Sequence, residues 1–199
     1  IEDEGIRLPP LVLNEEVRER FANASRTPEE RRGDLRAQEA ANHVAELRLT
    51  ELHQSCGEAS LARLNDALLD HTEQKMQALL RRIPNGVHTF TDHLDDGDAS
   101  GAPVPIPVIL TIADQSATID FRGAPDALPS SLNAVRAITI AAVFYVFRCL
   151  GESTLPANEG LLRPFTILTR PGSLCDAQEP AAVSAGNVET SQRMVDSLL

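Results

Sequence analysis

The densest group of side chains that could do chemistry is HTFTDHLDDGD, residues 88–98. Imidazoles and carboxylates are ligands that divalent metals accept. A strand places alternate side chains on opposite faces, so His88 and Asp92 share a face while His93 points to the other. The aspartates at 95–98 lack the spacing and the late glutamate of a calcium loop. We therefore expect a strand that ends in an exposed acidic turn, with His88 and Asp92 as the alternative metal site.

A second polar set lies in GDLRAQEAAN, residues 33–42. On a helical wheel, Gln38 and Asn42 fall within the arc of Ala41, Ala45, Leu49 and Leu52. Buried amides one turn apart must find hydrogen-bond partners. The pattern predicts either polar bracing between helices or a contact with a ligand or another chain.

A third polar set is GNVETSQR, residues 186–193. Here Asn187 or its loop caps a helix whose first turn carries Glu189. The free N–H groups of a helix start can hold an anion. Ordinary capping, with Glu189 near the positive end of the helix, explains the same residues. Both interpretations stay open.

Composition excludes several classes of protein. The 199 residues carry 29 acidic and 18 basic side chains, a formal charge of −11, which argues against a nucleic acid or an anionic membrane as partner. The apolar run at 137–147 is too short to cross a bilayer. The three cysteines show no metal spacing, which favours reduced thiols and a cytoplasmic location, with Cys149 in the core. No glycine-rich phosphate loop or nucleophile elbow occurs.

The first half of the chain reads as helical. Residues 14–25 predict a short helix, and Thr27 with Pro28 marks the start of a long one that runs to about Ser55. An interruption near Gly33 is left open. A second long helix is predicted from about Glu58 to Arg82, and we expect the two long helices to pack as an antiparallel hairpin.

The second half predicts a sheet with helices. Strands are expected at 87–94, 104–112, 117–121 and 163–169. The alternating Pro103, Pro105 and Pro107 predict that the second of them is an edge strand. A buried helix is expected at 133–150 and a C-terminal helix at 187–199. The fold class is mixed α/β: a long helical hairpin, then a β-sheet with a buried helix. We expect a helical region with an extended N-terminal arm at 1–85 and a β-rich region at 86–199.

Both ends of the sequence suggest a part of a larger, multi-domain protein. An apolar stripe of Val188, Val195, Leu198 and Leu199 is still running at the last residue, and no helix stop signal follows. The chain opens with IEDEGIRLPP, without an initiator methionine. We expect the isolated chain to be inactive and to self-associate through this stripe.

Several collinear segments resemble the hydantoinase B/5-oxoprolinase family. They are EDEGIRLPP (2–10), RTPEERRGDLRAQEAAN (26–42), LDD (94–96), IDFRGAP (119–125), LNAVRAITIAAVFYVFRCL (132–150), LPANEGLLRPFTI (155–167), PGSL (171–174) and PAAVSAGNVETSQRMVDSLL (180–199). Each is weak alone, and together they cover nearly the whole chain. The family's Asn-Ala-Gly-Cys stretch reads Asn158-Glu159-Gly160-Leu161 here.

The resemblance implies a B subunit or B domain of an ATP-dependent hydrolase. In such systems an A partner uses ATP, with Mg²⁺, to activate the oxygen of a hydantoin or of 5-oxoproline, and the B part completes ring opening. A divalent metal belongs to the intact complex, and its His-His-Ala-Asp-type motif is not in these residues. Related complexes carboxylate ketones, and a non-catalytic scaffold that docks the A partner is a third interpretation.

The same resemblance points to residues in the interior or at an interface of an oligomeric intact enzyme. No residue is identified as catalytic, and no cofactor is assigned to these residues alone. The candidates for substrate or interface contacts are Arg36, Gln38, Asn42, Asn187, Glu189 and Arg193.

Overall fold

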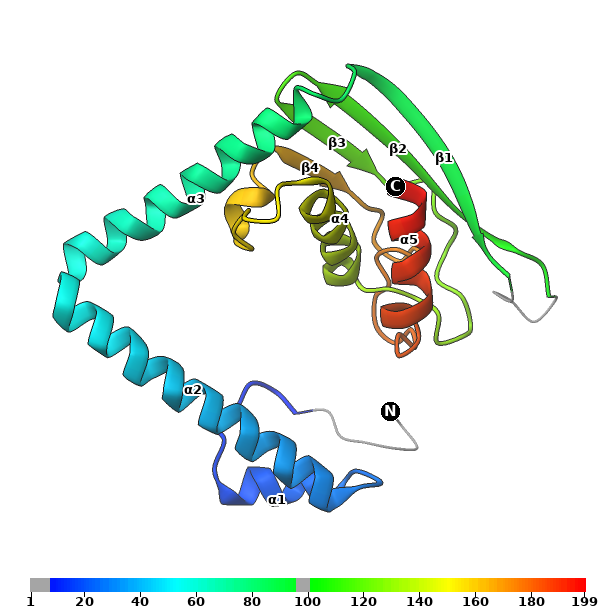
Figure 1. Cartoon of the computed structure of the whole chain (residues 1–199). Coiled ribbons are helices and arrows are strands. Elements are labelled where there is room, and N and C mark those ends of the chain that lie inside the picture. The colour runs from blue at the N-terminus through cyan, green and yellow to red at the C-terminus, as the bar shows by residue number, and fades with distance from the viewer. Residues whose placement is uncertain (1–7, 96–100) are drawn as a thin grey trace. The chain divides into compact units, whose positions relative to one another are not determined.

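The computed structural model describes residues 8–95 and 101–199 (Figure 1). The chain divides into two compact units, Ile1–Arg63 and Leu64–Leu199, and each is described by itself. Most of the predicted acidic turn, residues 96–98, lies outside the described residues, as does the start of the segment 2–10. Asp95, the first residue of that turn, is exposed.

The first unit contains helices α1, Glu15–Asn23, and α2, Pro28–Cys56. Pro28 occupies the first turn of α2, where a missing N–H costs nothing. The helix continues through Gly33 without interruption and ends before Gly57, whose φ of 76° favours glycine. Both predicted helices are confirmed, with ends within a few residues of those expected.

Two ion pairs join α1 to the first turns of α2. Arg18 donates to Glu39 at 2.7 Å, and Arg32 donates to Glu19 at 2.7 Å. The hydrogen bond from Arg32 lowers the pKa of the Glu19 carboxyl below its ordinary value. Ala22 of α1 is fully buried in this contact region. The N-terminal part of α2 is therefore held by polar contacts, with little apolar burial.

The rest of α2 is uncovered. None of its side chains is buried, and four large apolar residues are exposed: Val44, Leu47, Leu49 and Leu52. The packing of the two long helices into a hairpin stays a prediction, because most of α3 belongs to the second unit.

The second unit contains a four-stranded sheet. Its strands are β1 Gly86–Leu94, β2 Val104–Ala113, β3 Ser116–Asp120 and β4 Phe165–Leu168, in the order β1-β2-β3-β4. The first three strands are antiparallel neighbours, and β4 pairs parallel with β3. The four predicted strands and the mixed α/β class are confirmed.

The prediction that the proline-bearing strand lies at an edge is wrong for the strand as a whole. β2 lies between β1 and β3. However, β3 pairs only with Ile109–Ala113 of β2. Pro105 and Pro107 therefore lie in the half of β2 that pairs with β1 alone, where a missing N–H breaks no ladder bond.

Three helices pack with this sheet. They are the part of α3 (Glu58–Leu80) that follows Arg63, α4 (Arg136–Leu150), which connects β3 to β4, and α5 (Ser191–Leu198). A π-helical turn, Gly186–Thr190, leads into α5, and a 3-10 turn spans Glu159–Leu161. Figure 1 shows α4 and α5 on the same side of the sheet.

The core of the second unit lies between the sheet and these helices. Its fully buried side chains come from every helix and from β2, β3 and the loops: Met76, Leu80, Ile106, Ile119, Phe121, Val143, Val146, Leu161, Leu174 and Met194. These are mostly aliphatic, as the low aromatic content requires. None of the helices formed by the described residues is long and apolar enough to span a membrane.

The prediction that Cys149 belongs to the core is wrong. Cys149 is exposed. It follows Tyr145 by one helical turn, and Tyr145 is also exposed. The buried face of α4 carries Val143, Val146 and Phe147 instead. A residue that follows an apolar run can therefore lie on the exposed face of the helix.

Candidate functional site

The predicted polar sets fall into different units. Arg36, Gln38 and Asn42 lie on α2 in the first unit, and all three are exposed. The prediction of a buried Gln38–Asn42 pair is wrong, because no described element of the first unit covers this face of α2. The two amides therefore do not brace helices against each other within that unit, and an interface contact remains the open interpretation.

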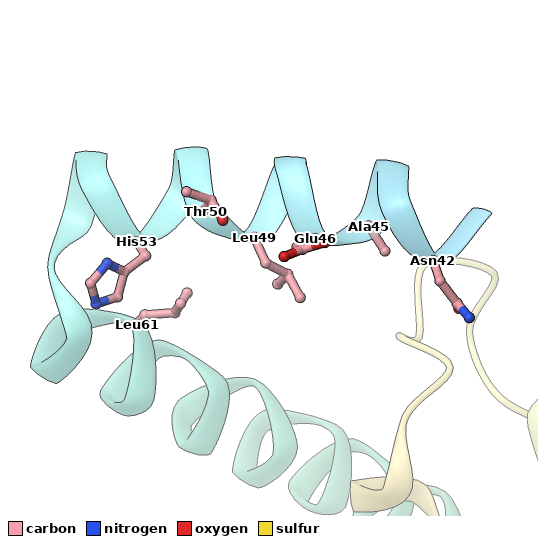
Figure 2. Close-up of a pocket in the computed structure, with 7 residues that line it drawn as sticks. All are labelled: Asn42, Ala45, Glu46, Leu49, Thr50, His53 and Leu61. Atoms are coloured by element: carbon pink, nitrogen blue, oxygen red, sulfur yellow. The ribbon is translucent and has the colours of Figure 1, made fainter. Parts of the chain in front are cut away.

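An open concave surface of about 590 Å³ includes Asn42. Figure 2 shows Asn42, Leu49 and His53 pointing to the same side of α2. The lining residues all belong to the first unit: Asn42, Ala45, Glu46, Leu49, Thr50, His53 and Leu61. Ala45, Leu49 and Leu61 are aliphatic and the other four lining side chains are polar, and the surface is open, so it suits contact with another polypeptide better than it suits bond chemistry.

The second unit brings part of the other polar set together. Glu189 and Arg193 line a cavity of about 420 Å³ with His93 and Asp95 from the end of β1. Leu94 and Leu132 complete the lining. We call this the polar pocket. Asn187 is exposed and is not in the lining.

Arg193 is held by two carboxylates. Its guanidinium lies 3.3 Å from Asp92 Oδ2 and 2.6 Å from Asp196 Oδ2. These two partners offset its charge, which leaves Asp95 and Glu189 as the uncompensated charges of the lining. The polar pocket is therefore acidic on balance, and it suits a neutral or cationic ligand better than an anion.

The start of the last helix also limits anion binding. The N–H groups of Val188 and Glu189 donate to the carbonyl of Ala185 at 3.0 and 2.8 Å. Hydrogen bonds already made inside the turn leave fewer free donors for a bound anion. These bonds belong to the π-helical turn itself. Neither this turn nor α5 has a side-chain cap, so Asn187 does not cap the helix.

His88 and Asp92, the alternative metal ligands, make contacts with other residues. Asp92 accepts from the N–H of His93 at 2.8 Å and pairs with Arg193. A ring nitrogen of His88 lies 3.4 Å from the carbonyl of Pro84. In residues 8–95 and 101–199, no three His, Cys, Asp or Glu side chains are grouped as metal ligands. The metal that the resemblance implies does not fit the described residues.

Asn133 follows the pocket residue Leu132 and organises the loop before α4, and sequence reasoning missed this role. This fully buried side chain accepts from the N–H of Leu128 at 2.6 Å. Its amide nitrogen donates to the carbonyls of Leu128, Ser130 and Ala182 at 2.8–2.9 Å. The only signal in the sequence is one Asn just before an apolar helix, and nothing there points to Ala182.

Gly186 and Thr190 fix the start of the last helix against the loop before α4. A Cβ on Gly186 would collide with the carbonyl of Asn133. The hydroxyl of Thr190 donates to the carbonyl of Leu132. These contacts fix the start of α5, and through it Glu189 and Arg193, against the loop before α4.

The Asn-x-Gly stretch at 158–160 is structural. Asn158 accepts from the N–H of Gly160 at 2.9 Å and donates to Thr72 of α3 at 3.0 Å. A Cβ on Gly160 would collide with the backbone of Leu69. The stretch therefore clamps the later part of α3 to the second unit.

Cys175 is not a nucleophile. It is fully buried, and burial, with a smaller contribution from Asp176, raises the pKa of its thiol to about 12. A thiol of that pKa carries almost no thiolate near neutral pH. Cys175 instead accepts, through its carbonyl, the hydroxyl of Thr139 at 2.6 Å.

Comparison with known proteins identifies relatives along the whole chain. The family model described as hydantoinase B/oxoprolinase matches residues 1–199. The 5-oxoprolinase of Saccharomyces cerevisiae is 32% identical over 170 residues, which cover 83% of this chain and 13% of that protein. Caprolactamase subunit beta of Pseudomonas jessenii is 30% identical over 185 residues, covering 89% of this chain and 32% of that protein.

Two solved structures share the fold. The ATP-dependent caprolactamase of Pseudomonas jessenii superimposes with a TM-score of 0.84 at 27% identity, covering 98% of this chain and 35% of that one. An acetone carboxylase superimposes with a TM-score of 0.71 at 15% identity, over 88% of this chain and 25% of that one. The chain thus spans about a third or less of the length of the proteins that it matches.

Proposed function

Because this chain belongs to the hydantoinase B/oxoprolinase family, we propose that it forms part of the B component of an ATP-dependent enzyme that opens a cyclic amide. The observation that carries the proposal is the match of all 199 residues to the family. It is supported by the likeness to a 5-oxoprolinase and to the beta subunit of a caprolactamase.

The proposed reaction explains why ATP and a partner are needed. Resonance makes the carbonyl of a ring amide a poor electrophile. Phosphorylation of its oxygen by an A-like partner, with Mg²⁺, would make attack by water feasible. The ring C–N bond would then break to release the amine, and a second water would release inorganic phosphate from the resulting acyl phosphate. This chain has no glycine-rich phosphate loop, so the proposal assigns ATP to the partner. A cytoplasmic location, which the free thiols favour, belongs to the same proposal.

Within this proposal, the polar pocket contacts the substrate or the A-like partner. A ring amide is neutral, donates through its N–H and accepts through its C=O. Glu189 could accept from such an N–H, and His93 could donate to such a C=O. Asn187, Arg36, Gln38 and Asn42 remain proposed interface residues, because none of them lines the polar pocket.

The test uses the longer parent protein with its A-like partner and ATP. ADP release would be followed with 5-oxoproline, hydantoin, caprolactam, or a ketone plus bicarbonate. ADP release coupled to ring-opened product with a cyclic amide supports the proposal. Coupling only to the ketone with bicarbonate would replace it with the carboxylase alternative, for which the acetone carboxylase supports the fold alone.

A docking scaffold is the second candidate, because α2 presents an uncovered apolar face. The variants Glu189→Gln and Arg193→Lys separate the two candidates. If the polar pocket contacts substrate, these variants change kcat or KM while binding of the A-like partner is kept. If the chain only docks the partner, turnover per bound complex is unchanged.

A further inference from the structure

Helix α4 is apolar on its exposed face as well as on its buried face. Of its 15 residues, only Arg136 and Arg148, near the two ends, are charged, and none is acidic. The buried face, with Val143, Val146 and Phe147, contributes to the core of the second unit. A helix that covers a sheet and faces water on its other side normally carries polar and charged residues there.

The exposed face is formed by Ala137, Ala141, Tyr145 and Cys149, which we call the outer face of α4. All four residues are exposed, and their spacing of four places them on one side of the helix. Between the two arginines, the only polar side chains are Tyr145 and Thr139. Thr139 is buried and donates to a backbone carbonyl, so the outer face offers water little except the hydroxyl of Tyr145.

This pattern separates α4 from α2, the other helix that exposes apolar residues. α2 carries charged side chains along its length, such as Glu46, Arg48 and Glu51, and can therefore face water. A helix that is apolar all round belongs either in a membrane or in the core of a large protein. With 15 residues, α4 is too short to cross a bilayer. The core of a larger protein is the remaining place for it.

The relatives have the length that such a core needs. The match covers 35% of the solved caprolactamase chain and 32% of caprolactamase subunit beta, which leaves about two thirds of each chain outside the match. The exposure of the outer face is that of the 199-residue chain alone. In a protein of the relatives' length, much more polypeptide is available to cover an apolar helix face.

We propose that, in the longer parent protein, a segment outside these 199 residues packs on the outer face of α4 and makes α4 an interior helix. The small side chains of Ala137 and Ala141 allow close approach of that segment. Within the described residues, the guanidinium of Arg148 has only the carbonyl of Glu152, at 3.4 Å, so we expect the segment to be apolar and to bring a carboxylate to Arg148.

A second copy of the chain fits this face less well. α4 contains no acidic residue, so two α4 helices that pack together offer no partner to each other's Arg136 and Arg148. The net charge of −11 also makes two copies repel each other. The inference depends on the family membership and on the length of the relatives, and it does not depend on the proposed reaction.

The cysteines of the chain supply the measurement. Cys149 lies on the outer face, whereas Cys175 is buried. The rate of alkylation by N-ethylmaleimide would be followed for each thiol by mass spectrometry, in the 199-residue chain and in the parent protein without its A-like partner. Cys149 should react about tenfold or more slowly in the parent, because a packed thiol reacts only after local opening. Cys175 should react slowly in both proteins and reports that each is folded.

Two variants of one residue test the contact directly. Ala141→Ser and Ala141→Glu should both leave the urea midpoint of the 199-residue chain unchanged, because Ala141 is exposed there. In the parent, Ala141→Glu places a charge in an apolar contact and should restore rapid labelling of Cys149, whereas Ala141→Ser should not. If the glutamate variant of the parent does not fold, the comparison of the two unmodified proteins decides.

Four results would overturn the proposal. Equal labelling of Cys149 in both proteins would mean that the outer face stays open in the parent. Slow labelling in the 199-residue chain at every concentration would mean that the chain covers the face itself. Labelling that slows as the concentration of that chain rises would identify a second copy as the occupant. Protection that appears only when the A-like partner is added would assign the face to that partner.

Discussion

At the scale of single residues, contacts with the backbone set the positions of the residues in the polar pocket. Asn133 and Gly186 hold together a loop and a helix start that are far apart in sequence. Glu189 and Arg193 take their places in the polar pocket from this contact. Precise positioning of a polar pocket by buried neighbours is what a binding or catalytic role would require.

Gly186→Ala should destabilise the second unit by about 1–3 kcal/mol, because its Cβ would press on the backbone of Asn133. Urea unfolding followed by the fluorescence of Tyr145, the single tyrosine, reports on this unit. Gly33→Ala is the control, since nothing lies near a Cβ at that position. An unchanged midpoint for Gly186→Ala would show that the close approach is not tight.

Asp120 and Arg122 predict a pH dependence. Hydrogen bonds from the Arg122 guanidinium hold the pKa of the Asp120 carboxyl below its ordinary value of 3.8. Because the folded pKa is the lower one, the pair stabilises the fold above pH 3.8, and this contribution is lost as pH falls through the folded pKa.

Arg122→Gln should therefore raise the pKa of Asp120 and lower stability at neutral pH. The stability difference from the unmodified chain should shrink in acid. Carboxyl NMR titration and urea unfolding at several pH values measure the two effects. An Asp120 pKa that does not move in the variant would contradict the assignment of its cause.

At the scale of elements, the two long helices differ in what they bury. Leu80 of α3 is fully buried, whereas Leu49 of α2 is 58% exposed. Leu80→Ala should cost about 2–5 kcal/mol of unfolding free energy, as deletions in packed cores do. Leu49→Glu should change it by less than about 0.5 kcal/mol, because glutamate also favours helix.

Circular dichroism during urea unfolding measures both variants. If the uncovered face of α2 is a docking surface, Leu49→Glu should still abolish binding of the A-like partner while leaving the fold intact. A large loss of stability in Leu49→Glu would mean that this face is packed within the chain in solution.

Local sequence signals predicted the helices and strands well, but they predicted poorly which other elements pack against each of them. Pro28, Gly57 and the turn near Pro84 mark helix ends by backbone chemistry alone, which a sequence shows directly. The place of β2 in the sheet depends on β3, so its prolines could not reveal it. The exposure of Gln38 and Asn42 depends on which element covers α2, and periodicity shows a face without showing its partner. Glu189 and Arg193 were candidates through the polar segment 186–193 and the family resemblance, whereas their grouping with His93 and Asp95 required the folded sheet.

At the scale of the whole molecule, the two units differ in their cores. Among residues 8–95 and 101–199, all of the large buried apolar side chains come after Arg63. Limited proteolysis by trypsin should first cut in the first unit, at sites such as Arg48 and Arg63. A resistant product that begins near Leu64 should accumulate, since cleavage requires local opening. Mass spectrometry identifies the cut sites, and equally fast cleavage within residues 104–168 would contradict this division.

The uncovered length of α2 has a thermodynamic consequence. The helix is 29 residues, about 44 Å at 1.5 Å per residue, and beyond its contacts with α1 it is held mainly by intrinsic propensity. Such a segment follows helix–coil statistics, not the cooperative melting of a core. Its ellipticity should fade gradually on warming, well before the second unit unfolds. A protein that binds α2 would make this gradual transition sharp. Its binding affinity would be lowered by the conformational entropy that α2 loses when it becomes ordered.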